Sequence, residues 1–118
     1  MSFSKVFSVL KSVLAEYSEG LQVTTDTGEI YSLDTRHIMK NGKPLFFASA
    51  VINKSYLSFH LMPVYVFPEL LDDMSPELKA RMQGKSCFNF KSIDDELVVE
   101  LKSLTRSGYE IYKSAGYV

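Results

Sequence analysis

The sequence predicts one α+β domain over residues 1–118, in which an antiparallel sheet of about five strands packs one face against N- and C-terminal helices. Amphipathic segments stand at the two ends of the chain, and short β-favouring runs separated by turn residues lie between them. A chain of 118 residues, 46% of them hydrophobic, can bury one core but not two. Two amphipathic helices need an apolar sheet face, so we expect both helices on the same side.

The first helix is expected over residues 3–17, with Ser2 or Ser4 as its cap and Gly20 after its end. Its apolar stripe has three- and four-residue spacing and consists of Phe3, Val6, Phe7, Leu10, Val13, Leu14 and Tyr17. Residues 21–24 and 29–33 predict a first hairpin. Residues 34–42 are polar and contain the turn signal Asn41-Gly42, which predicts a loop.

A second hairpin is predicted over residues 44–52 and 55–61, around the turn Asn53-Lys54. With a two-residue turn, Ala50 pairs with Leu57. One face then forms part of the core and consists of Phe46, Ala48, Ala50, Ile52, Leu57, Phe59 and Leu61. The opposite face is mixed and consists of Phe47, Ser49, Val51, Tyr56, Ser58 and His60. A slip of one residue would disrupt this scheme.

The remaining third of the chain predicts a short helix, a strand and a long helix. Three prolines in residues 63–83 exclude a long regular element there, and Ser75-Pro76 begins a helix over 76–82. Residues 85–90 form the last strand. The final helix begins after Ser92 and has an apolar stripe of Leu97, Val98, Leu101, Leu104, Ile111 and Tyr112. Within it, Gly108 marks either a close contact with the sheet or a break in the helix.

The last strand completes a candidate binding face. If Phe88 and Phe90 point into the core, their neighbours join the mixed face that holds His60. The candidate ligand-binding residues are Ser49, Tyr56, Ser58, His60, Lys85, Cys87 and Asn89. The pattern assigns no catalytic residue and identifies no cofactor.

Composition excludes several classes of protein. The net charge of −1 lacks the basic excess of a nucleic-acid-binding surface. No apolar run reaches the roughly 18 residues of a membrane span. Cys87 is the single cysteine, so neither an intrachain disulfide nor a cysteine-based zinc site can form. We therefore expect a cytoplasmic monomer or weak homodimer without nucleic-acid or membrane partners.

Two clusters of acidic residues have two possible interpretations, cation binding or an ordinary role at turns and helix starts. The first consists of Glu69, Asp72, Asp73 and Glu77, and the second of Asp94, Asp95, Glu96 and Glu100. Clustered carboxylates can bind hard cations, but acidic residues also collect at turns and at helix starts.

The run GKPLFFASAVINKSYLSFHLMP, the later run SPELKARMQGKSCFNF and a closing helix together resemble the YdhG-like family of small bacterial proteins. The resemblance covers residues 40–112. It implies a compact fold similar to frataxin, with a bent antiparallel sheet and terminal helices on one side. Some relatives are described as iron chaperones, so the resemblance also implies iron binding, although no matched motif transfers a metal ligand to this chain.

Three hypotheses follow. The first is a non-enzymatic binding module that presents the mixed face to a small ligand or a protein partner. The second is a frataxin-like iron-binding chaperone. The third is a small thiol enzyme with Cys87 as nucleophile and His60 as its base. We rank the enzyme last, because the chain lacks a convergent set of acid, base and nucleophile.

Overall fold

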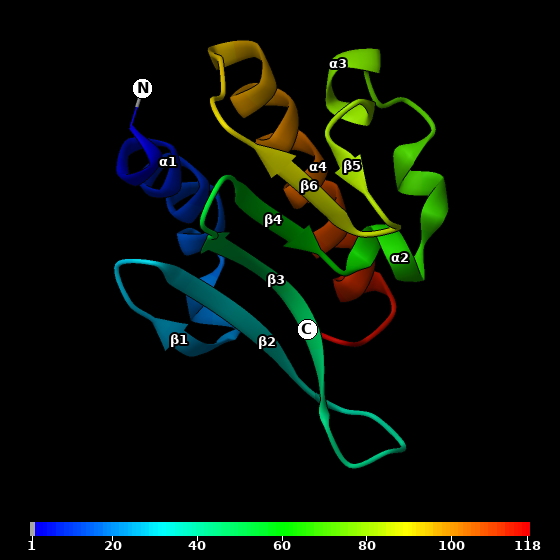
Figure 1. Ribbon diagram of the computed structural model, residues 1–118. Helices are drawn as coiled ribbons and strands as arrows, with labels where there is room; N and C mark the ends of the chain where they lie inside the picture. Colours follow the sequence, from blue (N-terminus) through cyan, green and yellow to red (C-terminus); the bar gives the residue numbers. More distant parts are fainter. Residues whose placement is uncertain (1) are drawn as a thin grey trace.

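A computed structural model describes residues 2–118 and shows an α+β fold with one six-stranded antiparallel sheet in the order β1-β2-β3-β4-β6-β5 (Figure 1). The strands are β1 (Gln22–Asp26), β2 (Ile30–Ile38), β3 (Pro44–Ile52), β4 (Leu57–Leu61), β5 (Met82–Gln83) and β6 (Cys87–Phe90). The α+β class with an antiparallel sheet is confirmed. The sheet has one strand more than predicted, the two-residue edge strand β5. At the other edge, the register of β1 on β2 shifts around Thr24.

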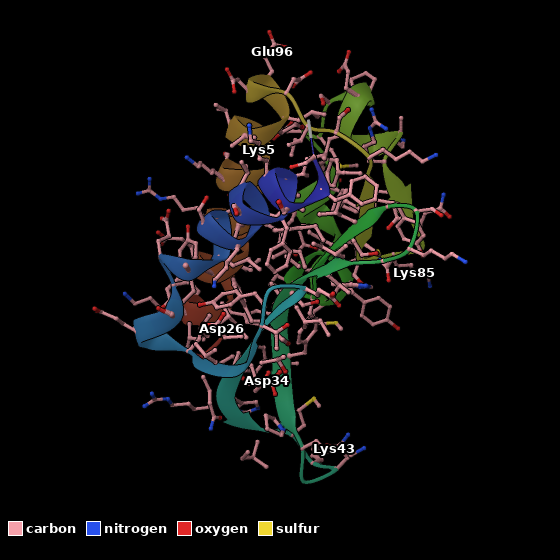
Figure 2. All side chains as sticks on the ribbon, turned by 60° about the vertical axis from the view of Figure 1, so that its left-hand side comes forward. Lys5, Asp26, Asp34, Lys43, Lys85 and Glu96 are labelled. Carbon is pink, nitrogen blue, oxygen red and sulfur yellow. The ribbon has the colours of Figure 1, made fainter. Side chains whose placement is uncertain are left out.

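Two long helices, α1 (Phe3–Ala15) and α4 (Asp95–Ser114), contact each other and lie on the same side of the sheet (Figure 2). The short segment η1 (Ser18–Gly20) joins α1 to β1. The segments α2 (Pro63–Val66), η2 (Pro68–Leu71) and α3 (Pro76–Lys79) join β4 to β5 and pack beside α4. Within residues 2–118, the opposite side of the sheet therefore has no helix across it.

The core lies between the sheet and the two long helices. Its fully buried side chains include Leu10 and Leu14 from α1, Phe59 and Phe88 from the sheet, and Leu101 from α4. Burying each such side chain contributes about 1.5–3 kcal/mol to folding. His60 follows Phe59 in β4 and is only half-buried, so the two neighbours lie on opposite faces, as the alternation predicts.

The second hairpin has a longer turn than predicted. Ile52 pairs with Leu57, and the backbone N–H of Asn53 donates to the carbonyl oxygen of Tyr56 at 2.8 Å. Ala50 consequently pairs with Phe59, and the predicted pairing of Ala50 with Leu57 is wrong. Because the register moves by two residues, these residues keep the faces that the sequence predicted.

A β-bulge in β3 overturns the predicted faces of two phenylalanines. Leu33 pairs with Ala48 and Asp34 with Phe46, so Phe47 is an extra residue in β3. Phe47 is fully buried among the helices, whereas Phe46 is half-buried and lies opposite Asp34. The bulge reverses the alternation locally, and the prediction of Phe46 inside and Phe47 outside is wrong.

Tyr112 of α4 packs on this bulge. Its ring centre lies 5.9 Å from that of Phe47, and its hydroxyl donates to the carbonyl oxygen of Phe46 at 3.1 Å. Burial raises the pKa of Tyr112, which keeps the phenol protonated as a hydrogen-bond donor. The last helix is therefore joined to the sheet by an aromatic contact and a hydrogen bond at one place.

Several element ends differ from the predictions. The expected loop 34–42 begins later, because β2 continues to Ile38 around the buried Thr35, whose hydroxyl donates to the carbonyl oxygen of Leu45 at 2.8 Å. The first helix ends at Ala15 and α3 at Lys79. The cap of α4 is Asp94 rather than the residue at position 92, since its carboxylate accepts from the N–H of Leu97 at 2.9 Å.

Gly108 marks a close contact and not a break. The helix continues through it to Ser114, and a Cβ atom placed on Gly108 would lie 2.9 Å from the Cβ atom of Pro63. This absence of a side chain lets α4 approach the corner where β4 leads into α2.

Thr105 of α4 gives a test of the core. Its hydroxyl is fully buried and has no hydrogen-bond partner within residues 2–118. Replacement by the similarly shaped valine should therefore raise the free energy of unfolding by about 1 kcal/mol in urea titrations. The matched control, Thr35→Val, removes a hydroxyl that forms hydrogen bonds and should lower the free energy of unfolding by about 1–3 kcal/mol. Destabilisation by both variants would contradict the conclusion that the Thr105 hydroxyl has no hydrogen-bond partner.

Candidate functional site

Strand pairing places a row of polar side chains across the uncovered face of the sheet. Successive neighbours in this row are Ser32, Ser49, His60, Cys87 and Gln83. A second row beside it consists of Ile30, Val51, Ser58 and Asn89. Side chains opposite one another on paired strands have Cβ atoms about 5 Å apart. We call these nine residues the open face.

The open face unites five of the seven predicted site residues, namely Ser49, Ser58, His60, Cys87 and Asn89. Tyr56 lies in the turn before β4, at the border of this face, and is 37% exposed. Lys85 lies in the turn between β5 and β6, outside the strand in which it was predicted, and extends outward from the sheet (Figure 2). Its ammonium group lies 5.9 Å from the ring centre of Tyr65, so it is separate from the others.

A chain of hydrogen bonds orders one end of the open face. The side-chain amide of Asn53 donates to Ser58 Oγ at 2.8 Å, and Ser58 Oγ donates to Asn89 Oδ1 at 3.1 Å. The thiol of Cys87 donates to the same Oδ1 atom at 3.4 Å. Because Oδ1 is the acceptor in these bonds, the orientation of the Asn89 amide is fixed, and its NH₂ group points away from Ser58.

Electrostatics at the centre of the open face favour neutral side chains. Burial lowers the pKa of His60 and raises the pKa of the Cys87 thiol. A nucleophilic cysteine needs the opposite shift, which a nearby cation or helix N-terminus normally provides. The facing pair therefore favours a neutral imidazole beside a protonated thiol, and no observation supports the thiol-enzyme hypothesis.

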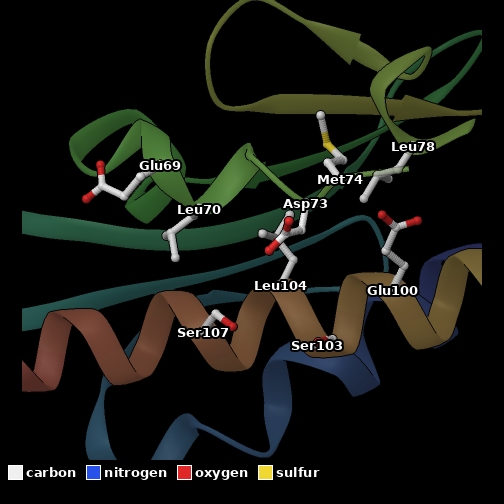
Figure 3. A pocket seen from close by; sticks show the side chains of 9 residues that line it. All are labelled: Glu69, Leu70, Asp73, Met74, Leu78, Glu100, Ser103, Leu104 and Ser107. Carbon is white, nitrogen blue, oxygen red and sulfur yellow. The ribbon is translucent and has the colours of Figure 1, made fainter. Parts of the chain in front are cut away.

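The predicted acidic groups do not form a metal site. Within residues 2–118, no group of three or more His, Cys, Asp or Glu side chains is placed to hold a metal ion. Glu69, Asp73 and Glu100 line a shallow hollow of about 290 Å³ between α4 and the η2–α3 segment (Figure 3). Glu100 accepts hydrogen bonds from the backbone N–H and the hydroxyl of Ser75, so it holds the residue that caps α3. Iron binding stays a prediction that no observation favours.

A second hollow of about 290 Å³ lies at the corner of the open face, beside the β5–β6 edge. It is lined by Tyr56, Ala80, Arg81, Gln83, Asn89, Phe90 and Lys91. We call it the corner hollow. The sequence prediction included Tyr56 and Asn89 but missed the two basic residues, Arg81 and Lys91. A signal for Lys91 was present, because it continues the alternation of Cys87 and Asn89.

Comparison of the chain with protein-family models, curated proteins and solved structures finds no match. The resemblance to the YdhG-like family consequently stays a prediction. Across residues 2–118, every helix is too short or too polar to span a membrane.

The pH dependence of stability should reveal the environment of His60. Since the pKa of His60 is lower in the folded chain than in the unfolded one, the unfolded chain binds the proton more readily below about pH 6.5. The free energy of unfolding should therefore fall as the pH decreases from 7.5 to 5. The variant His60→Gln should show a smaller fall in urea titrations. Parallel profiles for the two proteins would show that folding leaves the affinity of His60 for protons unchanged.

Alkylation should reveal the state of Cys87. Because burial raises the pKa of its thiol, iodoacetamide should modify the folded protein more slowly at pH 7.5 than it modifies N-acetylcysteine. Unfolding in urea should raise the rate toward that of the small thiol. His60→Ala should not slow the reaction. A folded-state rate above that of N-acetylcysteine, reduced by His60→Ala, would instead support the thiol enzyme.

Proposed function

We propose that the protein is a non-enzymatic binding module that uses its open face to bind a partner protein. The observation that carries the proposal is the unequal covering of the sheet: α1 and α4 pack on one side, and the nine residues of the open face, at the centre of the other side, carry no Lys, Arg, Asp or Glu, while the charged Asp34 and Lys91 continue that side at its borders. Antiparallel sheets often expose one face to water, and such faces are polar. Depletion of charged residues is characteristic of the centre of a protein–protein interface.

The shape of the open face favours a protein over a small molecule. Ser49 and Ser58, which have short side chains, are 7% and 6% exposed, respectively. Small-molecule sites are concave and enclose most of the ligand, whereas a stable protein interface buries about 800 Å² on each partner over a shallow surface. Ile30, which is 38% exposed, and Val51 supply apolar area in the second row.

We also propose that the domain is frataxin-like and YdhG-like, and that the protein is cytoplasmic. The position of two long terminal helices on one side of an antiparallel sheet supports a frataxin-like, YdhG-like domain. A single cysteine, free and half-buried, supports a reducing, cytoplasmic setting.

Two valines provide a matched test. Val51 lies on the open face, and Val99 is an exposed residue of α4 on the helical side. A photo-crosslinking amino acid at position 51, in cells that naturally make the protein, should give one discrete adduct with another protein. The same amino acid at position 99 should not give it. In the chain carrying the crosslinker at position 51, the second substitution His60→Arg should abolish the adduct while thermal unfolding remains cooperative.

The same experiment can contradict the proposal in three ways. Equal adducts from positions 51 and 99 would show unspecific contact. The absence of an adduct at position 51 would leave the open face without a partner. An adduct of two copies of this chain would assign the face to a homodimer instead.

A further inference from the structure

We infer that the corner hollow is a binding site for a small oxyanion ligand, one that carries a carboxylate or phosphate group. The inference goes beyond the proposed function, because it assigns a small ligand to a hollow that shares only Gln83 and Asn89 with the open face. The hollow combines two cationic side chains, two side-chain amides and a tyrosine, with no carboxylate in its lining.

The strand register explains why these side chains meet. Pairing of β4 with β6 ends at Leu57 and Phe90, so the next residues outward, Tyr56 and Lys91, are neighbours. Pairing of β5 with β6 joins Met82 to Phe88, which places the residue before Met82 beside the residue after Phe88. These residues are Arg81 and Asn89. The backbone N–H of Asn89 donates to the carbonyl oxygen of Arg81 at 2.8 Å, which fixes their positions.

Alternation along the strands places the polar groups on one side. Phe88 and Phe90 are buried in the core, so Asn89 between them and Lys91 after them belong to the opposite side. Gln83 is paired with Cys87 and therefore also belongs to the side of the open face. Gln83 and Asn89 thus lie on paired strands, which hold side chains more rigidly than a loop does, and Arg81 and Lys91 directly adjoin the ends of these strands.

The charges of the hollow favour an anion. Within residues 2–118, neither Arg81 nor Lys91 forms an ion pair, as is the case for most basic residues of this chain, but these two line the same hollow. Two unpaired cations in one hollow repel each other, and an anion between them removes that repulsion. An Arg guanidinium presents its N–H groups in a planar fork that matches a carboxylate or a phosphate, and Lys adds a point charge.

Asn89 supplies an oriented neutral donor. Its Oδ1 atom is occupied by the hydroxyl of Ser58 and the thiol of Cys87. The Ser58 hydroxyl has one proton, and it points at Asn89 because Ser58 Oγ accepts from Asn53. The NH₂ group of Asn89 has no acceptor within residues 2–118, so it remains available to a ligand in the corner hollow. The hydrogen-bond chain of the open face therefore orients the Asn89 NH₂ group as a donor at the corner of that face.

The size of the hollow limits the ligand. A volume of about 290 Å³ lies at the lower end of the range for small-molecule sites. A compact ligand fits, such as an oxyanion on one planar ring, and the partly exposed ring of Tyr56 offers a flat surface to it.

Three probes with the same ring test the inference. Benzoate, phenyl phosphate and the neutral benzamide are titrated into the ¹⁵N-labelled full chain at constant ionic strength. The anions should cause saturable shifts of the amide signals of Arg81, Gln83, Asn89 and Lys91, with a Kd on the order of 1 mM or below. Benzamide should bind at least about tenfold more weakly, since it lacks the charge. A tenfold preference between the anions would identify carboxylate or phosphate as the natural group, and similar affinities would support the shared oxyanion chemistry.

Charge-matched variants separate a site from a general electrostatic effect. Arg81→Gln and Lys91→Gln should each weaken binding by about tenfold, because each removes a charge-assisted contact. Lys85→Gln removes the same charge from the adjoining turn, outside the hollow, and should change the Kd by less than about twofold. Asn89→Asp replaces the amide donor with a carboxylate of the same shape and should abolish binding. The spectrum of each variant without ligand shows whether it is folded.

Three results would overturn the inference: equal weakening by Lys85→Gln, equal binding of benzamide, or shifts that do not saturate with either anion. None of them affects the crosslinking result at Val51, so the anion site and the protein partner can fail separately.

Discussion

The contact between Tyr112 and the bulge at Phe47 is the interaction on which the arrangement of this molecule depends. The extra residue in β3 turns an aromatic ring toward the helices, and the Tyr112 hydroxyl binds the carbonyl group that the bulge presents. This fixes the C-terminal helix on the same side as α1, with Gly108 allowing close approach to Pro63. The consequence lies on the other side of the sheet, where two rows of uncharged side chains remain without a helix across them.

The sequence predicted those parts of the fold that depend on periodicity. The three- and four-residue spacing in α1 and α4, together with alternation in β3 and β4, placed the helices and most of the core. The turn at Asn53 is longer than predicted, but the predicted faces of β4 are correct, since a register change of two residues preserves them. The bulge could not be predicted, because Phe46 and Phe47 are equally apolar, and only tertiary contacts of Phe47 with Tyr17, Tyr109 and Tyr112 distinguish them.

Alternation along the strands also made most of the open face predictable. Ser49, Ser58, His60, Cys87 and Asn89 share a face because alternation in three strands places them there. The corner hollow was not predictable from local pattern. Strand β5 has two residues, too few for a periodic signal, and Arg81 just before it was assigned to a helix. Its position beside Asn89 comes from pairing between chain segments, which a single sequence does not reveal.

The ends of the sheet limit the tendency to aggregate that an uncovered face with few charges would otherwise bring. Fibril growth needs a long, regular outer strand whose free N–H and C=O groups serve as a template for the next molecule. Here one border is irregular around Thr24 and the other is a strand of only two residues that is followed by the turn at Gly84. Neither offers a continuous ladder to an incoming chain. The molecule can therefore leave a broad face free for contact while its borders resist stacking into cross-β assemblies.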